Sequence, residues 1–343
     1  MNALRMASYV IAMRTTEKPR SLPVVAAEVG PHPVERAVFG SGDPALVAAA
    51  LEEALAEVGA VAEALFYRRG TGLVFGARLE DGRQVVAKIS ARARGAAFVE
   101  ECLRVRESFR ARGYPAPRLV AALRPFRGGF VVVDELCSEA PAPRDAAPLA
   151  EGLATWLRLA EGHAPGPSLG RAWLVTTSLG EIWPPPFRDP SRPSPALDAL
   201  ALRLLEARDG LVGKTVLSHF DWRAEHLAPG DEGAVLLYDW DSLHVELEPV
   251  AVGAAAHAFS SDRSGVMIGP APSRAEVDAF VSAFEATRGA SFSRAERWSV
   301  ELSLAYALAC TTRELELHGR EDPGFGALLE ESLRALGAGP RSV

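Results

Sequence analysis

The sequence predicts an α+β fold in which a small domain of antiparallel strands is followed by a larger, mainly helical domain. Two short apolar runs, 73–79 and 84–89, are joined by a loop that contains Asp81 and Gly82, a dipeptide typical of tight hairpins. Beyond about residue 145 the apolar residues recur at helical spacing instead. Helices are predicted over 146–162, 195–208, 273–289, 293–317 and 324–336. The length of 343 residues also favours two domains.

The bulk composition argues against several classes of protein. The formal net charge is -7 and no basic tract is present, so nucleic acid is not an expected partner. No apolar run approaches the ~18 residues of a membrane span, so no membrane association is expected. Cys102, Cys137 and Cys310 are widely scattered and show neither metal-binding nor disulfide spacing, which indicates a reducing compartment. We therefore expect a cytoplasmic protein whose acidic balance serves solubility or suits a cationic small molecule.

Residues 1–42 are expected to form an irregular N-terminal arm, because most of this segment is rich in proline, glycine and charge. The apolar residues near its start are interrupted by Arg5 and no small-residue cleavage site follows, so a secretion signal is not expected. A helix is predicted over 43–58. Asp43 is its expected N-cap and Pro44 occupies the first helical position.

A lysine in the second hairpin strand is a candidate anion-binding residue. In strand alternation Lys88 shares a face with Val86, whereas its direct neighbours point the other way. Such a lysine either meets an anion or lies on a surface strand. In the helix predicted over 97–112, Glu101 flanks the apolar stripe and is the best-placed partner for Lys88.

Glycines and a polar strand end mark the two borders of the strand region. Gly70 and Gly72 lie in a turn before the hairpin, where backbone amides can approach phosphates or simply form an ordinary loop. The apolar run at 130–136 ends in a polar connection, and 137–148 has the proline and alanine content of a linker. We therefore expect the small domain to end at about residue 136.

Two acidic clusters carry the clearest functional signal. Asp221 follows His219 by two residues and precedes His226 by five, and Asp239 closes an apolar strand 18 residues further along. Phosphoryl transfer needs one carboxylate to accept the proton of the attacking hydroxyl and another to hold the metal that bridges the nucleotide phosphates. Each cluster alone is common by chance. Together with the upstream lysine they indicate phosphoryl transfer.

The order of these features resembles the aminoglycoside phosphotransferase and choline kinase family, a branch of the protein-kinase-like fold. The similarity covers about 45–335 and is strongest over 216–227 and 236–243, with support from 85–89 and 113–119. It implies a two-lobed α+β fold with a small antiparallel lobe and a larger helical lobe. It also implies ATP- or GTP-dependent transfer of a phosphoryl group to a hydroxyl of a small molecule, such as an aminoglycoside, another antibiotic or a metabolite.

The resemblance further implies domain boundaries at 43–136 and 137–343, with a catalytic loop over 217–227 and a metal-binding segment over 236–243. Asp221 would then be the catalytic base.

By the same resemblance, Asp239 would be the ligand of Mg²⁺, and Lys88 would contact the nucleotide phosphates while Glu101 holds it. In a two-lobed kinase the end of the 130–136 strand is the hinge, whose backbone groups bind adenine. The other candidate nucleotide-binding residues are Gly70, Gly72, Val86, Asp134 and Leu136.

The chain departs from the family pattern at His226, where the family usually has an asparagine that binds Mg²⁺. An amide oxygen is a hard donor, whereas imidazole prefers softer metals such as Zn²⁺ or Mn²⁺. His226 is therefore a candidate ligand for Mg²⁺ or Mn²⁺, or a hydrogen-bond donor to a phosphate. The alternative to an active kinase is a nucleotide-binding protein of the pseudokinase type with little transferase activity.

Two residues of the first cluster have alternative interpretations. His219 either bonds a backbone group near the catalytic turn or shuttles a proton. Arg223, a candidate catalytic residue, either neutralises the transferring phosphate or pairs with Glu225 or Asp241.

The regions around the clusters leave two further choices. Glu246 and Glu248 either line an acceptor site or belong to a solvated loop, and the proline-rich loop that begins at Trp183 and runs through Pro195 is either a wall or lid of that site or a rigid connection.

Overall fold

The computed structural model of the chain describes residues 33–69, 72–91, 95–137, 144–229, 235–257, 259–260 and 269–337. The described residues form two compact units. The first takes in those up to Arg104 and those within Ala116–Glu139, and the second takes in the others. The boundaries predicted from the sequence, 43–136 and 137–343, stay a prediction. Within the described ranges, none of the helices combines the length and the apolar content that crossing a membrane requires.

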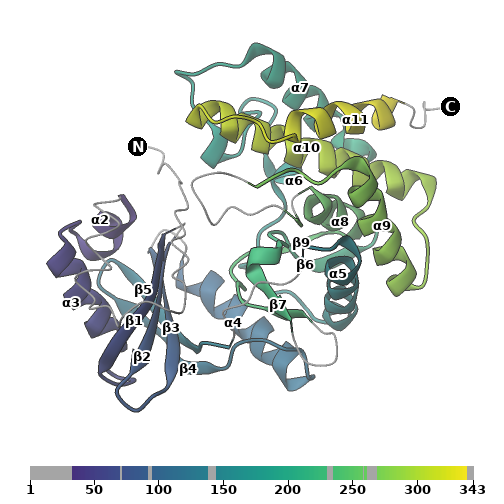
Figure 1. Cartoon of the computed structure of the whole chain (residues 1–343). Coiled ribbons are helices and arrows are strands. Elements are labelled where there is room, and N and C mark those ends of the chain that lie inside the picture. The colour runs from purple at the N-terminus through teal and green to yellow at the C-terminus, as the bar shows by residue number, and fades with distance from the viewer. Residues whose placement is uncertain are drawn as a thin grey trace. The chain divides into compact units, whose positions relative to one another are not determined.

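The first unit is built on a five-stranded antiparallel sheet in the order β1-β2-β3-β5-β4 (Figure 1). Its strands are β1 (Val61–Arg69), β2 (Gly72–Leu79), β3 (Gln84–Ala91), β4 (Leu119–Phe126) and β5 (Gly129–Glu135). In the turn between β2 and β3, Leu79 N donates to Arg83 O at 2.8 Å, and Gly82 adopts a φ of 85° that favours glycine. The antiparallel small domain predicted from the hairpin pattern is confirmed.

Helix α3 (Pro44–Leu55) packs its apolar side on this sheet (Figure 1). Asp43 is its N-cap, as predicted, because Asp43 Oδ1 accepts hydrogen bonds from Ala45 N at 2.9 Å and Leu46 N at 3.1 Å. Leu51 and Leu55 are fully buried in the same core as the inward-facing strand residues. This core holds the sheet that carries the candidate nucleotide-binding residues.

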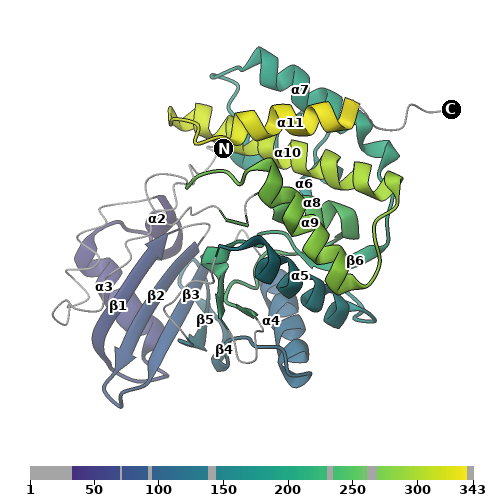
Figure 2. The same cartoon turned by 45° about the vertical axis from the view of Figure 1, so that its right-hand side comes forward.

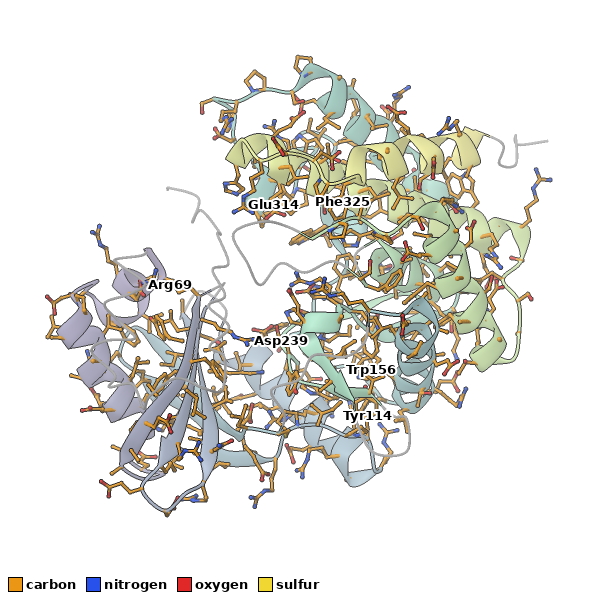
Figure 3. All side chains as sticks on the ribbon, in the orientation of Figure 1. Arg69, Tyr114, Trp156, Asp239, Glu314 and Phe325 are labelled. Atoms are coloured by element: carbon orange, nitrogen blue, oxygen red, sulfur yellow. The ribbon has the colours of Figure 1, made fainter. Side chains whose placement is uncertain are left out.

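A second helix, α2 (Pro33–Phe39), lies within the segment that we expected to be irregular, which corrects that part of the prediction. Val34 and Val38 are one helical turn apart and both join the core of the first unit, so packing stabilises a helix too short to form alone. Glu35 on the same helix is buried and pairs with Arg69, which Figure 3 labels. Residues 1–32 of the predicted arm lie outside the described residues.

Lys88 lies on the face of β3 predicted from strand alternation. Its neighbours Val85, Ala87 and Ile89 belong to the buried core of the first unit, and Lys88 is directed to the opposite face of the strand. Helix α4 (Ala96–Ala111) follows β3 at the predicted position.

The second unit is mainly helical, and all five helices predicted from periodicity are confirmed (Figure 2). They are α5 (Ala146–Ala160), α7 (Pro195–Glu206), α9 (Arg274–Arg288), α10 (Arg294–His318) and α11 (Phe325–Gly337). The structure adds α6 (Trp173–Thr176) and α8 (Glu248–Ala256). All nine residues of α8 are buried, so this helix has no exposed polar stripe that a periodicity analysis detects.

An aromatic cluster in the second unit supports the segment that carries Asp239. The ring of Phe109 lies 5.1 Å from that of Trp156 and 5.6 Å from that of Trp240, and Tyr114 contacts both Phe109 and Trp240. Figure 3 labels Tyr114, Trp156 and Asp239. Because Trp240 directly follows Asp239, its burial in this cluster restricts the backbone at the second acidic cluster.

Candidate active site

The catalytic segment predicted around Asp221 follows a short buried strand. Strand β6 (Thr215–His219) pairs antiparallel with β9 (Leu243–Leu247), and Phe220 N extends this pairing by donating to Ser242 O at 2.9 Å. The chain then turns into a 3-10 helix over Ala224–His226. Asp221 lies in that turn, where its side chain is 37% exposed and accessible to a reactant.

A hairpin brings the second acidic cluster to the first. After the turn that holds Asp221, β7 (Leu227–Pro229) pairs antiparallel with β8 (Val235–Leu237). Tyr238 N donates to His226 O at 2.9 Å, so the chain that continues into Asp239 runs beside His226. The buried ring of His219 makes a short hydrogen bond through Nε2 to the main-chain oxygen of Asp239. The backbone of Asp239 is thus held close to the segment that carries Asp221, although the two residues lie 18 positions apart in the sequence.

His219 therefore bonds a backbone group close to the turn that holds Asp221. This is the first of the two interpretations given for His219 in the sequence analysis. Nε2 is the protonated ring nitrogen, because a carbonyl oxygen only accepts hydrogen bonds. Nδ1 is buried and has no hydrogen-bond partner among the described residues. Burial lowers the pKa of His219 to about 4, against the opposing effect of the bond to Asp239, so the ring is neutral near pH 7. A neutral and enclosed ring is suited to holding the backbone.

Arg223 bridges two carboxylates of the first cluster. Its Nη2 donates to Asp221 Oδ2 at 2.8 Å, and its Nε lies 2.6 Å from Asp221 Oδ1. Its Nη1 lies 2.5 Å from Glu225 Oε1. The pairing with Glu225 considered in the sequence is present, and the structure adds the contact with Asp221, which sequence reasoning missed. Two anions around one guanidinium raise the pKa of Arg223, although burial acts to lower it.

The same contacts hold Asp221 in its ionised form. Partial burial acts to raise the pKa of this carboxyl, but the charge of Arg223 and the hydrogen bond that it donates outweigh that effect and keep the pKa well below its usual range. A carboxylate with a low pKa is a weak base. It is therefore suited to orienting a hydroxyl and accepting its proton late, as phosphoryl transfer through a loose transition state allows.

His226 faces the first cluster directly. Its Nδ1 lies 3.1 Å from the main-chain oxygen of Asp221 and 3.5 Å from Asp221 Oδ2, and its Nε2 lies 3.8 Å from Glu225 Oε1. A ring nitrogen that contacts a carbonyl oxygen at this distance donates a proton to it. Nε2 then carries the lone pair of the ring, which faces Arg223 Nη2 at 3.4 Å, so a metal would have to displace that contact. The protonated Nδ1 orients the backbone of the turn that holds Asp221.

The residues present fit a magnesium ion held with a nucleotide better than a preformed metal cage. Within the described part of the chain, no group of three or more histidine, cysteine or acidic side chains is arranged to hold a metal ion. Mg²⁺ is usually bound by one or two carboxylates together with substrate phosphates and water. Asp239 is a hard oxygen donor of the required kind, and its Oδ1 makes a long contact of 3.5 Å with Asp241 N. His226 is the softer neighbouring donor.

The candidate nucleotide-binding residues lie in the first unit, where their roles stay predictions. Val86 and Lys88 lie on β3, and Val86 is paired in register with Asp134 of β5. The N–H of Leu136 donates to Gln84 O at 3.1 Å and so extends the sheet. Glu101 accepts a hydrogen bond from Arg104 Nε at 3.0 Å, and its predicted pairing with Lys88 stays a prediction.

Two residues of the predicted glycine turn belong to strands. Arg69 ends β1 and Gly72 begins β2. Gly70 lies outside the described residues. At Gly72 an added Cβ would lie 2.5 Å from Ile89 O, so the close approach of β3 is one physical reason for glycine at this position.

Glu246 and Glu248 are both buried, which corrects the expectation of a solvated loop. Glu246 Oε2 accepts a hydrogen bond from Ala172 N at 3.0 Å, and Glu248 Oε2 lies 3.0 Å from Arg288 Nη2. Burial raises the pKa of Glu248. Neither carboxylate is exposed enough to line an acceptor site.

The proline-rich loop is fastened to the helical unit at several points. Arg192 caps the C-terminal end of α10 by donating to Glu316 O at 3.0 Å and to Leu317 O. Trp183 Nε1 donates to Asp198 Oδ1 at 2.7 Å, and Tyr306 OH donates to Ile182 O at 3.3 Å. These bonds favour the interpretation as a rigid connection over a lid.

Comparison with solved structures places the chain among small-molecule kinases in fold. An amicoumacin kinase in complex with AMP-PNP and Ca²⁺ is similar to this chain with a TM-score of 0.55 and 11% sequence identity. The match covers 78% of this chain and 86% of the kinase. For a choline kinase from Streptococcus pneumoniae, the match covers 84% of this chain and 98% of the kinase, with a TM-score of 0.53 and 13% sequence identity. For a spectinomycin phosphotransferase, the match covers 84% of this chain and 93% of the phosphotransferase, with a TM-score of 0.51 and 12% sequence identity.

These similarities establish the protein-kinase-like fold of the aminoglycoside phosphotransferases and choline kinases, as the resemblance in the sequence implied. No protein-family model and no curated protein matches the chain.

Proposed function

We propose that the chain is an ATP-dependent phosphotransferase that acts on a hydroxyl of a small molecule, with GTP as the other nucleotide to test. The observation that carries the proposal is the hydrogen bond of His219 to the main chain of Asp239, which joins the two acidic clusters. The fold shared with small-molecule kinases supports it.

In this proposal Asp221 orients the acceptor hydroxyl and accepts its proton. Arg223 keeps Asp221 ionised, so the carboxylate is ready without a change of protonation. Arg223 is also close enough to Asp221 to stabilise the charge of the transferring phosphoryl group.

Asp239 would hold Mg²⁺, and His226 would be the second ligand of the metal. Because imidazole suits softer metals, His226 would bind Mn²⁺ in preference to Mg²⁺. The bound ion would neutralise charge on the nucleotide phosphates. Lys88, steadied by Glu101, would bind those phosphates. We assign the remaining nucleotide contacts to Gly70, Gly72, Val86, Asp134 and Leu136. The acceptor is a small molecule, and we propose a cytoplasmic protein without nucleic-acid or membrane partners.

The test is nucleotide turnover across a panel of hydroxylated compounds. Aminoglycosides, other hydroxylated antibiotics, amino alcohols and sugars are each incubated with ATP or GTP, and ADP or GDP release is measured. Acceptor-dependent release that disappears in Asp221→Ala is the expected result. Release that does not depend on an acceptor, or that survives in Asp221→Ala, would contradict the proposal.

One observation favours a second function, a nucleotide-binding protein with little transferase activity. Both His226 and Arg223 are engaged with Asp221, and the usual amide ligand is absent from the position of His226. Such a protein would bind nucleotide with Mg²⁺ or Mn²⁺ and show no acceptor-dependent turnover with any compound in the panel.

A further inference from the structure

Three aromatic side chains lie together, and one of them belongs to the residue that precedes the candidate base. The ring of Trp173 lies 6.3 Å from that of Phe220 in an edge contact, and the ring of Phe220 lies 5.4 Å from that of His244. Phe220 directly precedes Asp221 in the sequence. All three rings are partly exposed, and we name them the aromatic platform.

A buried carboxylate fixes the loop that leads into Trp173 at the start of α6. Glu246 is 0% exposed, and its two oxygens accept hydrogen bonds from Ala172 N at 3.0 Å and Leu247 N at 2.8 Å. Val245 N donates to Gly170 O at 2.9 Å and ties the same loop to β9. Burying a charge is costly unless hydrogen bonds compensate it, so this arrangement is a specific anchor. Trp173 is therefore held in place before any ligand binds.

The proline-rich loop supports Trp173 from another side. Phe187 is buried in this loop, and its ring packs edge-on against that of Trp173 at 5.3 Å. The loop itself is anchored to α7 and α10 by the hydrogen bonds described above. Trp173 thus contacts both Phe187 and Phe220, and a rigid aromatic surface is formed.

The carboxylates of the segment that carries Trp173 are already bonded within the protein. The segment 171–198 contains three of them. Glu181 pairs with Arg188 at 2.7 Å, Asp189 accepts from Ser191 Oγ at 2.6 Å, and Asp198 accepts from Trp183 Nε1 at 2.7 Å. A polycationic ligand requires carboxylates that are available to pair with its charges. The carboxylates of this segment are engaged within the protein, and the segment instead presents the ring of Trp173.

We infer that the aromatic platform binds the acceptor, and that the acceptor presents an apolar or planar face next to the hydroxyl that reaches Asp221. Aromatic side chains bury large apolar surfaces and stack on planar groups, and a platform held rigid loses little entropy on binding. The inference rests on the proposed function and specifies it further: the substrate class is an apolar-faced alcohol, and a polycationic aminoglycoside is disfavoured.

The test compares two probes by ligand-observed NMR binding. A macrolide supplies hydroxyls on a large apolar face, and kanamycin supplies hydroxyls on a polycation. We expect the wild type to bind the macrolide more tightly than kanamycin. Trp173→Ala should weaken macrolide binding by at least ~10-fold, whereas Trp173→Phe, which keeps a ring, should stay within about 3-fold. The control Trp298→Ala removes a partly exposed tryptophan from α10 and should change neither affinity.

Three outcomes would overturn the inference: macrolide binding unchanged in Trp173→Ala, tighter binding of kanamycin than of the macrolide, or binding of neither probe. If Trp173→Ala fails to fold, as judged by its thermal transition, Trp173→Leu takes its place, because leucine fills more of the space without a ring.

Phosphoryl transfer is measured separately on the same proteins. Binding that requires Trp173 without any transfer would contradict the proposed function alone. Transfer to kanamycin that is unaffected by Trp173→Ala would contradict this inference alone.

Discussion

The ring of His219 donates a hydrogen bond from Nε2 to the main-chain oxygen of Asp239, and this bond joins the two acidic clusters. Because the ring is buried and its other nitrogen has no hydrogen-bond partner among the described residues, the site tolerates only the neutral form. The bond that joins the two clusters is therefore linked to pH through a buried residue.

The first prediction concerns that link. The pKa of His219 is lowered to about 4 by burial, from the 6.5 expected in the unfolded chain. The unfolded state then binds more protons between these values, so the contribution to stability is complete above about pH 6.5 and is lost as the pH falls toward about 4. The full loss is on the order of 3 kcal/mol. Urea denaturation of the wild type at about pH 7 and about pH 4.5 measures it.

The control for this prediction is His219→Asn, whose side chain is able to donate to the same carbonyl but does not titrate. Its stability should depend less steeply on pH over this range than that of the wild type. Equal slopes in the two proteins would show that His219 is not responsible.

The second prediction concerns the base. Asp221→Asn keeps the shape of the side chain but removes its ability to accept a proton, so kcat should fall by at least ~10²-fold. Nucleotide affinity, measured by calorimetry, should be largely kept. Asp209→Asn changes an exposed carboxylate outside the site and serves as the matched control. Near-normal turnover in Asp221→Asn would exclude this assignment.

The third prediction concerns Arg223. Without its guanidinium, the effect of burial on Asp221 is less strongly opposed, so the pKa of Asp221 should rise. In Arg223→Met the acid limb of the kcat/KM profile should therefore move to higher pH, and activity should be lost earlier as the pH falls. Arg223→Lys, which keeps the charge, should shift the limb less. An acid limb at the same pH in all three proteins would argue against control of Asp221 by Arg223.

The fourth prediction concerns the histidine at the asparagine position. If His226 contributes to metal binding, His226→Asn supplies the oxygen donor that Mg²⁺ prefers, so activity in magnesium should be kept or increased and any preference for manganese reduced. If its ring positions a phosphate, Asn should substitute partly and Ala should be markedly worse. Turnover of both variants in both metals distinguishes these roles. Unchanged activity throughout would place His226 outside the chemistry.

The fifth prediction concerns the buried pair that fastens α2 to β1. Glu35 Oε1 accepts hydrogen bonds from Arg69 Nε at 2.6 Å and Tyr67 OH at 2.9 Å. Arg69→Met leaves the carboxylate buried without its cation and should destabilise the protein by about 3–5 kcal/mol. The double variant Glu35→Gln/Arg69→Met should recover much of this loss in urea denaturation. A double variant as unstable as the single one would show that the charge is not the cause.

Local patterns were enough to predict most of the framework. The cap at Asp43 and the hairpin turn at Gly82 depend on hydrogen bonds between residues at most four apart, so a few letters of sequence specify them. The long helices of the second unit carry an apolar stripe because one side faces a core. Helix α8 was missed for the opposite reason, since it is buried on every side.

The order of the motifs in the sequence determined the fold class and the pair of carboxylates, Asp221 and Asp239, because their residue types and spacing are visible without any partner. Only the tertiary structure decided which partners the buried acidic side chains bond. Glu35 bonds a residue 34 positions away, and Glu246 bonds one 74 positions away. Such partners meet only when distant segments pack together, and the cost of burying each charge makes the pairing specific. The same packing set the ring of Trp173 against that of Phe220, the residue before Asp221.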